Sequence, residues 1–217
     1  MRRGTGVTDA WSERAQLYRE SRAHAEGADL DLVVEWAAGS RTAIDVATGG
    51  GHVARRLREA GLEVVTCDPA PGMRPDVICF AEDLPFAADS FDLAVTRVAA
   101  HHFADVAAAV GELARVAPRV VVVDNLRLGD AAEEAERIRD PSHVRNHSED
   151  EWRDLFAAAG LAVEEVRRFD FPIELEPWLE RTACTGDEAE RVKELLADRI
   201  RGVEIVLDRI ALLGWRR

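Results

Sequence analysis

The chain has 217 residues, of which 47% are hydrophobic, so it can bury a sizeable core and is not mainly disordered. Acidic residues outnumber basic ones by 41 to 28, and the net charge of −13 argues against nucleic acid or an anionic membrane surface as a partner. Three scattered cysteines, no signal-peptide pattern and no run of ~18 apolar residues argue against a disulfide framework, secretion and a membrane span, so we expect a cytoplasmic protein.

A helical region precedes the predicted sheet. Apolar residues at helical spacing predict two helices within residues 8–38, separated at Gly27 and ended at Gly39. Beyond it, short apolar strands alternate with helices, which is typical of a doubly wound α/β sheet. Strands are predicted over 42–47, 62–68, 76–80, 91–98 and 119–125, and helices over 52–61 and 105–117. Because residues 120–123 are continuously apolar, we expect helices on both faces of a parallel sheet.

The last third of the chain is predicted to complete and cover this sheet. Residues 131–140 form a charged helix whose pattern predicts a mostly solvated surface. A second helix, 148–160, begins with a capping box of Ser148 and Glu151. A strand over 161–171, a helix over 187–200 and a final strand over 204–217 follow. We therefore expect an α/β, Rossmann-like sheet that is mostly parallel with an antiparallel C-terminal edge strand.

A glycine-rich turn follows the first predicted strand. Residues 48–51, Thr-Gly-Gly-Gly, connect a buried strand to a helix N-terminus and so place backbone N–H donors beside a ligand. Asp68 ends the next strand, where a carboxylate can accept both ribose hydroxyls of an adenine nucleoside. The alternative is a tight turn that needs glycine only for its backbone. The order of strand, turn, helix and carboxylate favours nucleotide binding.

Two cofactor classes share this arrangement. Gly49, Gly51 and Ala54 fit the dinucleotide pattern G-x-G-x-x-A. Asp45, however, lies on the first strand four residues before Gly49. There its carboxylate can meet the ammonium group of a methionine moiety, which a dinucleotide does not have. This spacing favours S-adenosylmethionine over NAD.

The stretch from Ile44 to Asn125 resembles the class I S-adenosylmethionine-dependent methyltransferases, specifically those of ubiquinone and menaquinone biosynthesis and their small-molecule relatives. The matching strings are IDVATGGGH, VVTCD and AEDLPFAADSFDLAVTR, and AAHHF, RDPSHVRNHSEDEW and AGLAVEEV narrow the resemblance to a bacterial subgroup. The resemblance implies a methyltransferase (EC 2.1.1.-) that methylates a small organic acceptor. We divide its single domain, 1–217, into an N-terminal helical cover (1–40), a cofactor-binding core (41–125) and a C-terminal cover (126–217).

The resemblance also implies which residues bind S-adenosylmethionine. The methionine part would be cradled by Asp45, Ala47, Gly49 and Gly51, with Thr48 in the same turn. The ribose and adenine would be bound by Asp68, Pro69, Ala81 and Glu82. Arg97 and Val98 would pass under the sulfonium, and Tyr18 would close over the cofactor.

Two adjacent histidines are the predicted catalytic residues. Methyl transfer needs in-line positioning and, for some acceptors, a base. His101 and His102 follow the fourth predicted strand, on the carboxyl side of the sheet where ligands bind. Either imidazole can deprotonate or orient a nucleophile. The alternative is that the two residues cap the next helix.

Further candidates for substrate binding lie in the C-terminal cover. His143 and His147 are a second pair, but their polar, proline-containing setting predicts a loop, so we assign no metal site. Arg145 can hold an acidic group of the substrate. Trp178 lines either the acceptor pocket or the core. We assign His143, Arg145 and Trp178 to substrate binding.

Two features depart from the family pattern. Phe80 stands where the family has an Asp that accepts a hydrogen bond from the adenine amino group, and a phenyl ring offers no acceptor. Only residues 69–75, three of them proline, join the second and third strands, too few for a crossover helix. We therefore expect a stretched connection, an uncovered sheet face near Val64, Val77 and Cys79, and weakened cofactor affinity. A homodimer or the C-terminal part of the chain is our hypothesis for what covers that face.

Two alternatives to methyl transfer remain at this point. One is a non-catalytic or cofactor-sensing protein with an altered adenine pocket, and the other is an NAD-dependent oxidoreductase. The expected partner is a small-molecule acceptor, with no nucleic acid and no membrane.

Overall fold

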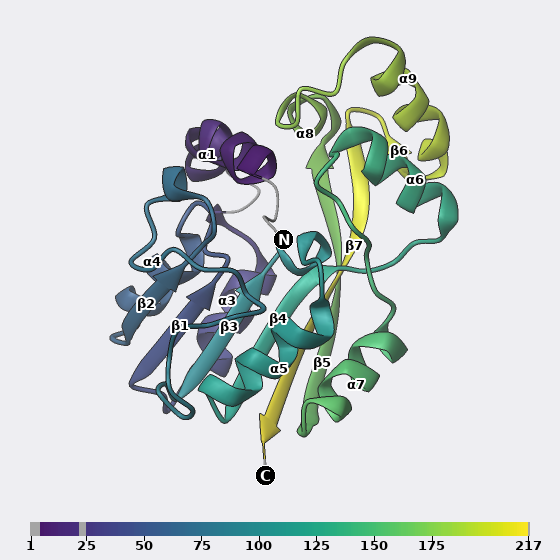
Figure 1. The fold of residues 1–217 in the computed structure, drawn as a ribbon. Helices are drawn as coiled ribbons and strands as arrows, with labels where there is room; N and C mark the ends of the chain where they lie inside the picture. Colours follow the sequence, from purple (N-terminus) through teal and green to yellow (C-terminus); the bar gives the residue numbers. More distant parts are fainter. Residues whose placement is uncertain (1–4, 22–24, 217) are drawn as a thin grey trace.

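The computed structural model describes residues 5–21 and 25–216, and its strands there form one seven-stranded sheet. The strands are β1 (Thr42–Val46), β2 (Glu63–Cys67), β3 (Leu93–Arg97), β4 (Arg119–Asn125), β5 (Leu161–Glu174), β6 (Ile200–Arg201) and β7 (Glu204–Arg216). Their order is β2-β1-β3-β4-β7-β5, with β6 paired to β7 (Figure 1). Strands β1 to β4 are parallel, and β7 is antiparallel to both β4 and β5. This confirms the expected fold class, and the antiparallel strand lies one place in from the edge, which β5 forms.

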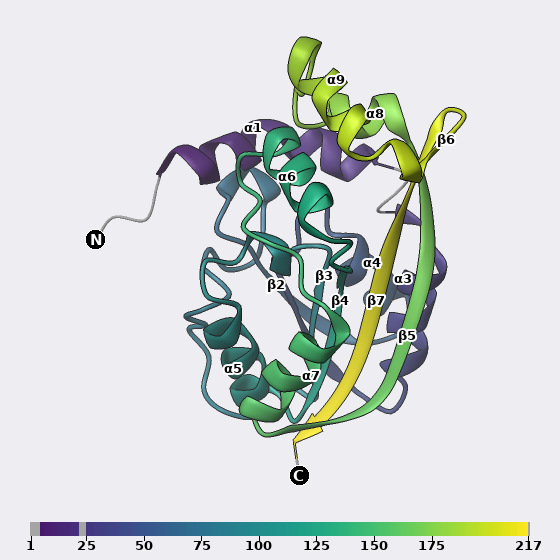
Figure 2. The ribbon, with the colours of Figure 1, turned by 90° about the vertical axis from the view of Figure 1, so that its right-hand side faces the viewer.

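Helices cover both faces of the sheet. They are α1 (Thr5–Glu20), α3 (Ala28–Trp36), α4 (His52–Glu59), α5 (Val106–Val116), α6 (Asp130–Arg139), α7 (Glu149–Ala158), α8 (Leu175–Glu180) and α9 (Gly186–Leu195), with single 3-10 turns η1 (Pro71–Met73), η2 (Ala100–His102) and η3 (Ala197–Arg199). Figure 2 shows α3 and α4 on one face and α5 and α7 on the other. In β4, Val120 and Val122 pack with the α5–α7 layer and Val121 and Val123 with the α3–α4 layer, as the continuous apolar run predicts. Within the described residues no helix is long and apolar enough to span a membrane.

The strands β5 and β7 are longer than the others and extend beyond the parallel strands. Their far ends carry α8, β6 and α9, which pack with α6 around a separate apolar cluster (Figure 1). Helix α1 lies on the other side of the same end of the sheet, against η1. The carboxyl ends of the parallel strands therefore face a space between α1 and the α6–α8–α9 group.

The expectation that residues 131–140 are mostly solvated is wrong. Helix α6 packs on α9 and buries Ala132 and Ala135 in the cluster that the two helices share. Glu136 and Arg139 are buried as well, and they form an ion pair of 3.0 Å. The charge pattern predicted exposure, but these two charged side chains are buried because they pair with each other.

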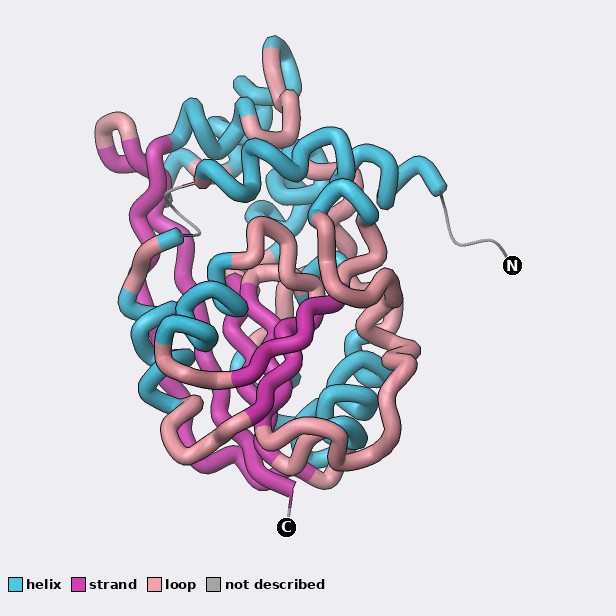
Figure 3. Tube along the Cα trace, turned by 90° about the vertical axis from the view of Figure 1, so that its left-hand side faces the viewer, coloured by secondary structure: helices cyan, strands magenta, loops and turns pink. Residues whose placement is uncertain are grey.

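The connection between β2 and β3 contains no crossover helix, as predicted. Its one regular element is the three-residue turn η1, and Figure 3, which faces the β2 side, shows loop in this region. The predicted strand 76–80 is wrong, because only Val77 pairs with β2. Its N–H donates to Thr66 O at 3.0 Å, and Ile78 is already 61% exposed. The Asp76 carboxylate accepts hydrogen bonds from Thr66 N–H and Oγ1–H, so a side chain replaces further strand pairing.

The cover expected from the C-terminal part is also not found there. The connection does not return stretched along the sheet; it turns at η1, where Met73 packs with Ala15 of α1. Val64 packs with the α3–α4 layer, whereas Val77 and Cys79 pack with the α5 side, so the three do not share one bare face. The C-terminal strands lie at the opposite edge of the sheet from β2. The N-terminal helix packs on η1, and the helix layers on the two faces of the sheet cover Val64, Val77 and Cys79.

Gly72 sets how closely η1 approaches α1. A Cβ added at Gly72 would lie 2.5 Å from Ser12 O and 2.6 Å from Ser12 Cα, so backbone would have to move. We predict that Gly72→Ala lowers the free energy of unfolding by about 1–3 kcal/mol, the usual cost of overpacking. Gly111→Ala, within α5 and with nothing within 4 Å of the added Cβ, is the control and should stabilise by about 0.5–1 kcal/mol. Urea denaturation measures both, and equal midpoints for the two variants would contradict this prediction.

Candidate active site

A cavity of about 350 Å³ opens at the carboxyl ends of β1, β2 and β3. It is lined by Thr8, Trp11, Tyr18, Asp45, Ala47, Thr48, Gly49, Gly50, His52, Val53, Asp68, Pro69, Met73, Phe80, Ala81, Glu82, Arg97, Val98, Ala99, His102, Phe103 and Ala104. Of the residues predicted to bind the cofactor, all line this cavity except Gly51. The structure therefore brings together positions that are up to 80 residues apart, from Tyr18 to Val98.

The glycine turn has no room for a side chain at Gly50, because α1 packs directly against it. A Cβ at Gly50 would lie 2.7 Å from Tyr18 O and 2.8 Å from His52 Nε2. The same two groups are joined by a hydrogen bond of 2.9 Å, in which the ring Nε2–H donates to the carbonyl. Gly49 and Gly51 have φ of +52° and +77°, which glycine adopts without strain. The turn thus lines the cavity with backbone atoms. The His52 ring, which is hydrogen-bonded to the Tyr18 carbonyl, lines it as well.

Asp45 is a buried carboxylate at the end of β1. Its Oδ2 accepts hydrogen bonds from Thr48 Oγ1–H at 2.6 Å and from Ala54 N–H at 3.1 Å. Burial raises the pKa of Asp45 to about 6. Ala47 follows with φ of +57°, a conformation that non-glycine residues adopt at a cost and that is found at functional sites. A cationic group of a ligand would stabilise the ionised form of this carboxylate.

Asp68 joins the end of β2 to the glycine turn. Its Oδ2 accepts from Gly49 N–H at 3.0 Å and its Oδ1 from Ala70 N–H at 2.9 Å. Burial raises the pKa of this carboxyl as well. Phe80 also lines the cavity; its ring is 38% exposed and offers no hydrogen-bond acceptor. Glu82, another lining residue, accepts a hydrogen bond through Oε1 from Ala104 N–H at 3.0 Å. The wall beside Asp68 is therefore an apolar slot with one polar edge.

A buried ion triad lies at the end of β3 next to the cavity. Asp29 of α3 accepts two hydrogen bonds from Arg97, at 2.8 and 3.2 Å, and one from Arg209 of β7 at 2.9 Å. The three side chains are only 2–3% exposed. Arg97 thus lines the cavity but commits its guanidinium to Asp29, and the triad ties α3, β3 and β7 together beneath the site.

A second, small cavity of about 40 Å³ adjoins the first. It is lined by Tyr18, Val98, His101, His102, Asn125, Arg139, Asp140, Phe171, Ile173, Trp178, Arg181, Leu207 and Arg209. Tyr18, Val98 and His102 line both cavities. Val98 has φ of +54°, so strained backbone marks the boundary between them. Tyr18, Val98 and His102 therefore lie at the boundary of the two cavities.

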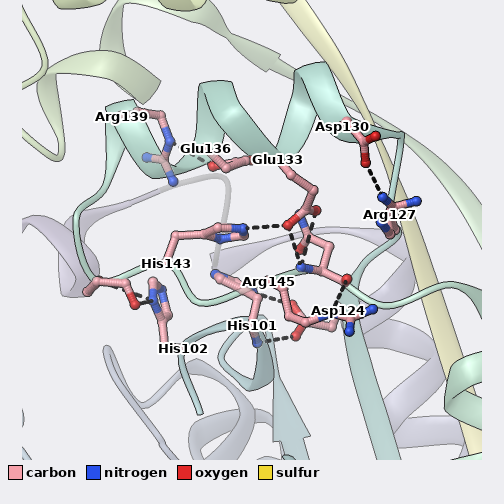
Figure 4. A network of polar contacts seen from close by, with 12 residues as sticks. His101, His102, Asp124, Arg127, Asp130, Glu133, Glu136, Arg139, His143 and Arg145 are labelled. Atoms are coloured by element: carbon pink, nitrogen blue, oxygen red, sulfur yellow. Dashed lines mark hydrogen bonds and ion pairs between the residues drawn. The ribbon is translucent and has the colours of Figure 1, made fainter. Parts of the chain in front are cut away.

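The predicted catalytic pair lies in η2, and its two rings differ in environment. Asp124 at the end of β4 accepts from His101 Nδ1–H at 2.6 Å and from His101 N–H at 2.8 Å (Figure 4). Burial lowers the pKa of His101, but the Asp124 carboxylate outweighs burial and raises it. The expectation that the histidines cap the next helix is wrong, because Asp105 caps α5 by accepting from Ala108 N–H. Neither ring is therefore used for that cap.

His102 is neutral at physiological pH. Burial and the neighbouring His101 lower its pKa to about 3. Its Nδ1 lies 3.1 Å from both Ser142 O and Ser142 Oγ, and the Ser142 hydroxyl donates to Asp140 at 2.6 Å. Because a carbonyl oxygen only accepts, the ring proton is on Nδ1, which leaves an acceptor lone pair on Nε2. His102 therefore offers a hydrogen-bond acceptor at the boundary of the two cavities.

The residues predicted to bind substrate do not all lie together. Trp178 lines the small cavity. His143 is buried against Glu133, 3.2 Å from its carboxylate (Figure 4). Arg145 forms an exposed ion pair with Glu151. Neither of these two lines either cavity. Within residues 5–21 and 25–216 no three His, Cys, Asp or Glu side chains gather as ligands for a metal ion.

A parallel sheet with helices on both faces, a glycine turn after β1 and carboxylates at the ends of β1 and β2 define the class I S-adenosylmethionine-dependent methyltransferases. Comparison with known proteins agrees. A family model described as "Methyltransferase domain" matches residues 44–119. The curated protein YcgJ of Bacillus subtilis strain 168, an uncharacterised methyltransferase, is 33% identical over 211 residues, which cover 86% of this chain and 82% of YcgJ. The chain belongs to this methyltransferase class, with YcgJ among its relatives.

Solved structures extend the comparison. The crystal structure of YcgJ superposes with a TM-score of 0.79 and 27% identity, over 87% of this chain and 98% of that one. BH2331 of Bacillus halodurans C-125, a methyltransferase candidate, superposes with a TM-score of 0.75 and 25% identity, over 88% and 99%. Geranyl diphosphate methyltransferase in complex with S-adenosylmethionine, 16% identical, shares the fold with a TM-score of 0.63 over 88% and 85%. S-adenosylmethionine is the methyl donor of this family.

Several residues of the site were not predicted from the sequence. Asp124 ends a buried strand, as Asp45 and Asp68 do, so the rule that selected those two would have selected it as well. Arg209 interrupts the apolar pattern of the last strand, which is a recognisable sign of a buried charge. No pattern in the sequence indicates that Arg181 or His52 lies at the site.

Proposed function

We propose that this methyltransferase transfers the methyl group of S-adenosylmethionine to a small organic acceptor that spans the two cavities. The observation that carries the proposal is that Tyr18, Val98 and His102 line both cavities. A cofactor in the large cavity and an acceptor reaching into the small one would meet at these residues. The motifs that resemble methyltransferases of ubiquinone and menaquinone biosynthesis support a small acceptor, and so does the net charge of −13.

The chain's own residues fit the cofactor. Asp45 would accept the ammonium group of the methionine part, and the bare backbone of the glycine turn would lie along it. Asp68 would accept the ribose hydroxyls, since it lines the cavity and two backbone N–H groups hold its carboxylate in place. Phe80 and Pro69 would enclose the adenine. When bound, the cofactor supplies an electrophilic methyl group on its sulfonium, and the protein has to position the acceptor in line with it.

His102 would orient the acceptor by accepting a hydrogen bond from it, because an imidazole with a pKa of about 3 is too weak a base to take its proton at physiological pH. His102 lines both cavities, and its Nδ1–H donates to Ser142, which leaves the Nε2 lone pair for the acceptor. His101 would hold the His102 ring in position, because the two ring centroids lie 4.1 Å apart and Asp124 fixes the His101 ring. Asp124 is thus a positioning residue.

A panel of methyl acceptors tests the proposal directly. The protein is incubated with S-adenosylmethionine and with phenols, amines and carboxylic acids of small size, or with duplex DNA or tRNA, and formation of S-adenosylhomocysteine is measured. We expect turnover with a small molecule above the acceptor-free rate and none with nucleic acid. Turnover with DNA or tRNA alone would contradict the proposal.

Replacing both histidines separates catalysis from cofactor binding. We predict that His101→Ala combined with His102→Ala lowers kcat by about 100-fold, the cost that misplacing the acceptor can reach. Affinity for S-adenosylhomocysteine should change by less than a factor of three, and Arg137→Ala, at an exposed residue in neither cavity, should leave kcat unchanged. Unchanged turnover in the double variant would show that the pair is structural.

A further inference from the structure

The small cavity contains a guanidinium that has no counter-ion. Arg181 follows α8 and is half-buried in this cavity. Across the described part of the chain its guanidinium makes no hydrogen bond or ion pair. Burial and the neighbouring Arg139 guanidinium lower its pKa. A partly desolvated cation without a partner is costly, and a bound anion would remove that cost.

The other charges around the small cavity are already matched. Arg139 pairs with Glu136 and lies 4.3 Å above the Trp178 ring centroid. Arg209 pairs with Asp29, and its Cζ lies 3.3 Å from the Phe171 ring centroid.

One carboxylate among the described residues, Asp140, also lines the small cavity, but it is engaged. It accepts hydrogen bonds from the N–H and the O–H of Ser142. His101, whose pKa the Asp124 carboxylate raises, lines this cavity as well. Since Arg139 and Arg209 are matched and Asp140 is engaged, the guanidinium of this cavity that lacks a carboxylate partner among the described residues is that of Arg181.

From this we infer that the small cavity is an anion subsite of the acceptor, in which Arg181 binds a carboxylate or phosphate group. The inference rests on the proposed function and narrows the acceptor to a small organic anion. A volume of about 40 Å³ accommodates one such group and little more, so the body of the acceptor would extend past His102 toward the large cavity. A guanidinium binds both groups with two parallel hydrogen bonds, which would fix the direction of the acceptor.

Benzoate and its neutral isostere benzamide test the subsite by ligand-observed NMR at pH 7.5, with and without saturating S-adenosylhomocysteine. We expect benzoate to bind at least tenfold more tightly than benzamide. Arg181→Gln should remove this preference and Arg181→Lys should retain part of it. Arg137→Gln, which removes an exposed cation outside both cavities, should leave it unchanged. Unfolding midpoints confirm that each variant is folded.

The outcomes separate this inference from the proposed function. Equal binding of benzoate and benzamide, or a preference that survives Arg181→Gln, would overturn the anion subsite even if S-adenosylhomocysteine binds normally. Failure of S-adenosylhomocysteine to bind the wild-type protein would overturn the proposed function, while the benzoate preference measured without it would still decide the subsite. Arg181→Gln should keep its affinity for S-adenosylhomocysteine, since Arg181 does not line the large cavity.

Discussion

Replacing Asp29 with alanine should lower the free energy of unfolding by about 3–5 kcal/mol, the usual cost of breaking a buried ion pair. The carboxylate is 2% exposed and accepts hydrogen bonds from Arg97 and Arg209. Arg209 lies 180 residues from Asp29 along the chain. Without the Asp29 carboxylate, Arg209 would be buried with no paired carboxylate in the described structure. Chemical denaturation monitored by tryptophan fluorescence measures the change.

Asp31 offers a matched control on the same helix. Its carboxylate pairs with Arg56, but the two side chains are 67% and 27% exposed. Exposed pairs contribute about 0–1 kcal/mol, so Asp31→Ala should be nearly neutral. If Asp29→Ala were as mild as Asp31→Ala, the triad would not be a structural tie between α3, β3 and β7.

Affinity for S-adenosylmethionine should fall as the pH drops through about 6. In the free protein the pKa of Asp45 is about 6, so acidification below this value neutralises the carboxylate that would accept the ammonium group. Binding a cation favours the ionised form, so the affinity should fall up to tenfold per pH unit below this pKa. Asp45→Asn should lower the affinity at pH 8 by about 10–100-fold, since hydrogen bonds to charged groups contribute about 1.5–3 kcal/mol. Calorimetry between pH 5 and 8 measures both effects.

Two controls assign the effect to Asp45. The pKa of Asp68 is also raised, so the acid limb that remains in Asp45→Asn reports on Asp68. Methylthioadenosine, which lacks the amino-acid part, should bind Asp45→Asn as well as it binds the wild type. Equal losses for both ligands would show that Asp45 supports the turn and does not contact the ammonium group.

Interactions that are local in sequence were predictable. Ser148 and Glu151 exchange the two hydrogen bonds of a capping box, at 2.8 and 3.2 Å, because both partners lie within one helical turn. The glycine turn and the strand-end carboxylates Asp45 and Asp68 follow the same logic, since each is fixed by the strand that precedes it.

Features that depend on tertiary packing were not predictable. The apolar alternation of Val77 and Cys79 resembles a strand, but pairing stops after one residue because β2 ends at Cys67, the partner of Val77. The charge pattern of α6 predicts a solvated helix, because nothing in its own sequence indicates that α9 packs against it. The small cavity joins side chains from Tyr18 to Arg209, and no local pattern encodes such a set.

The measurement that tests the central claim most directly is calorimetry of the wild-type protein with S-adenosylmethionine, S-adenosylhomocysteine and NADH, run side by side at pH 8. The large cavity, with Asp45 and Asp68 at its strand ends, predicts that both sulfur compounds bind one per chain and that NADH binds far more weakly. Tight binding of NADH with no heat from either sulfur compound would contradict the account.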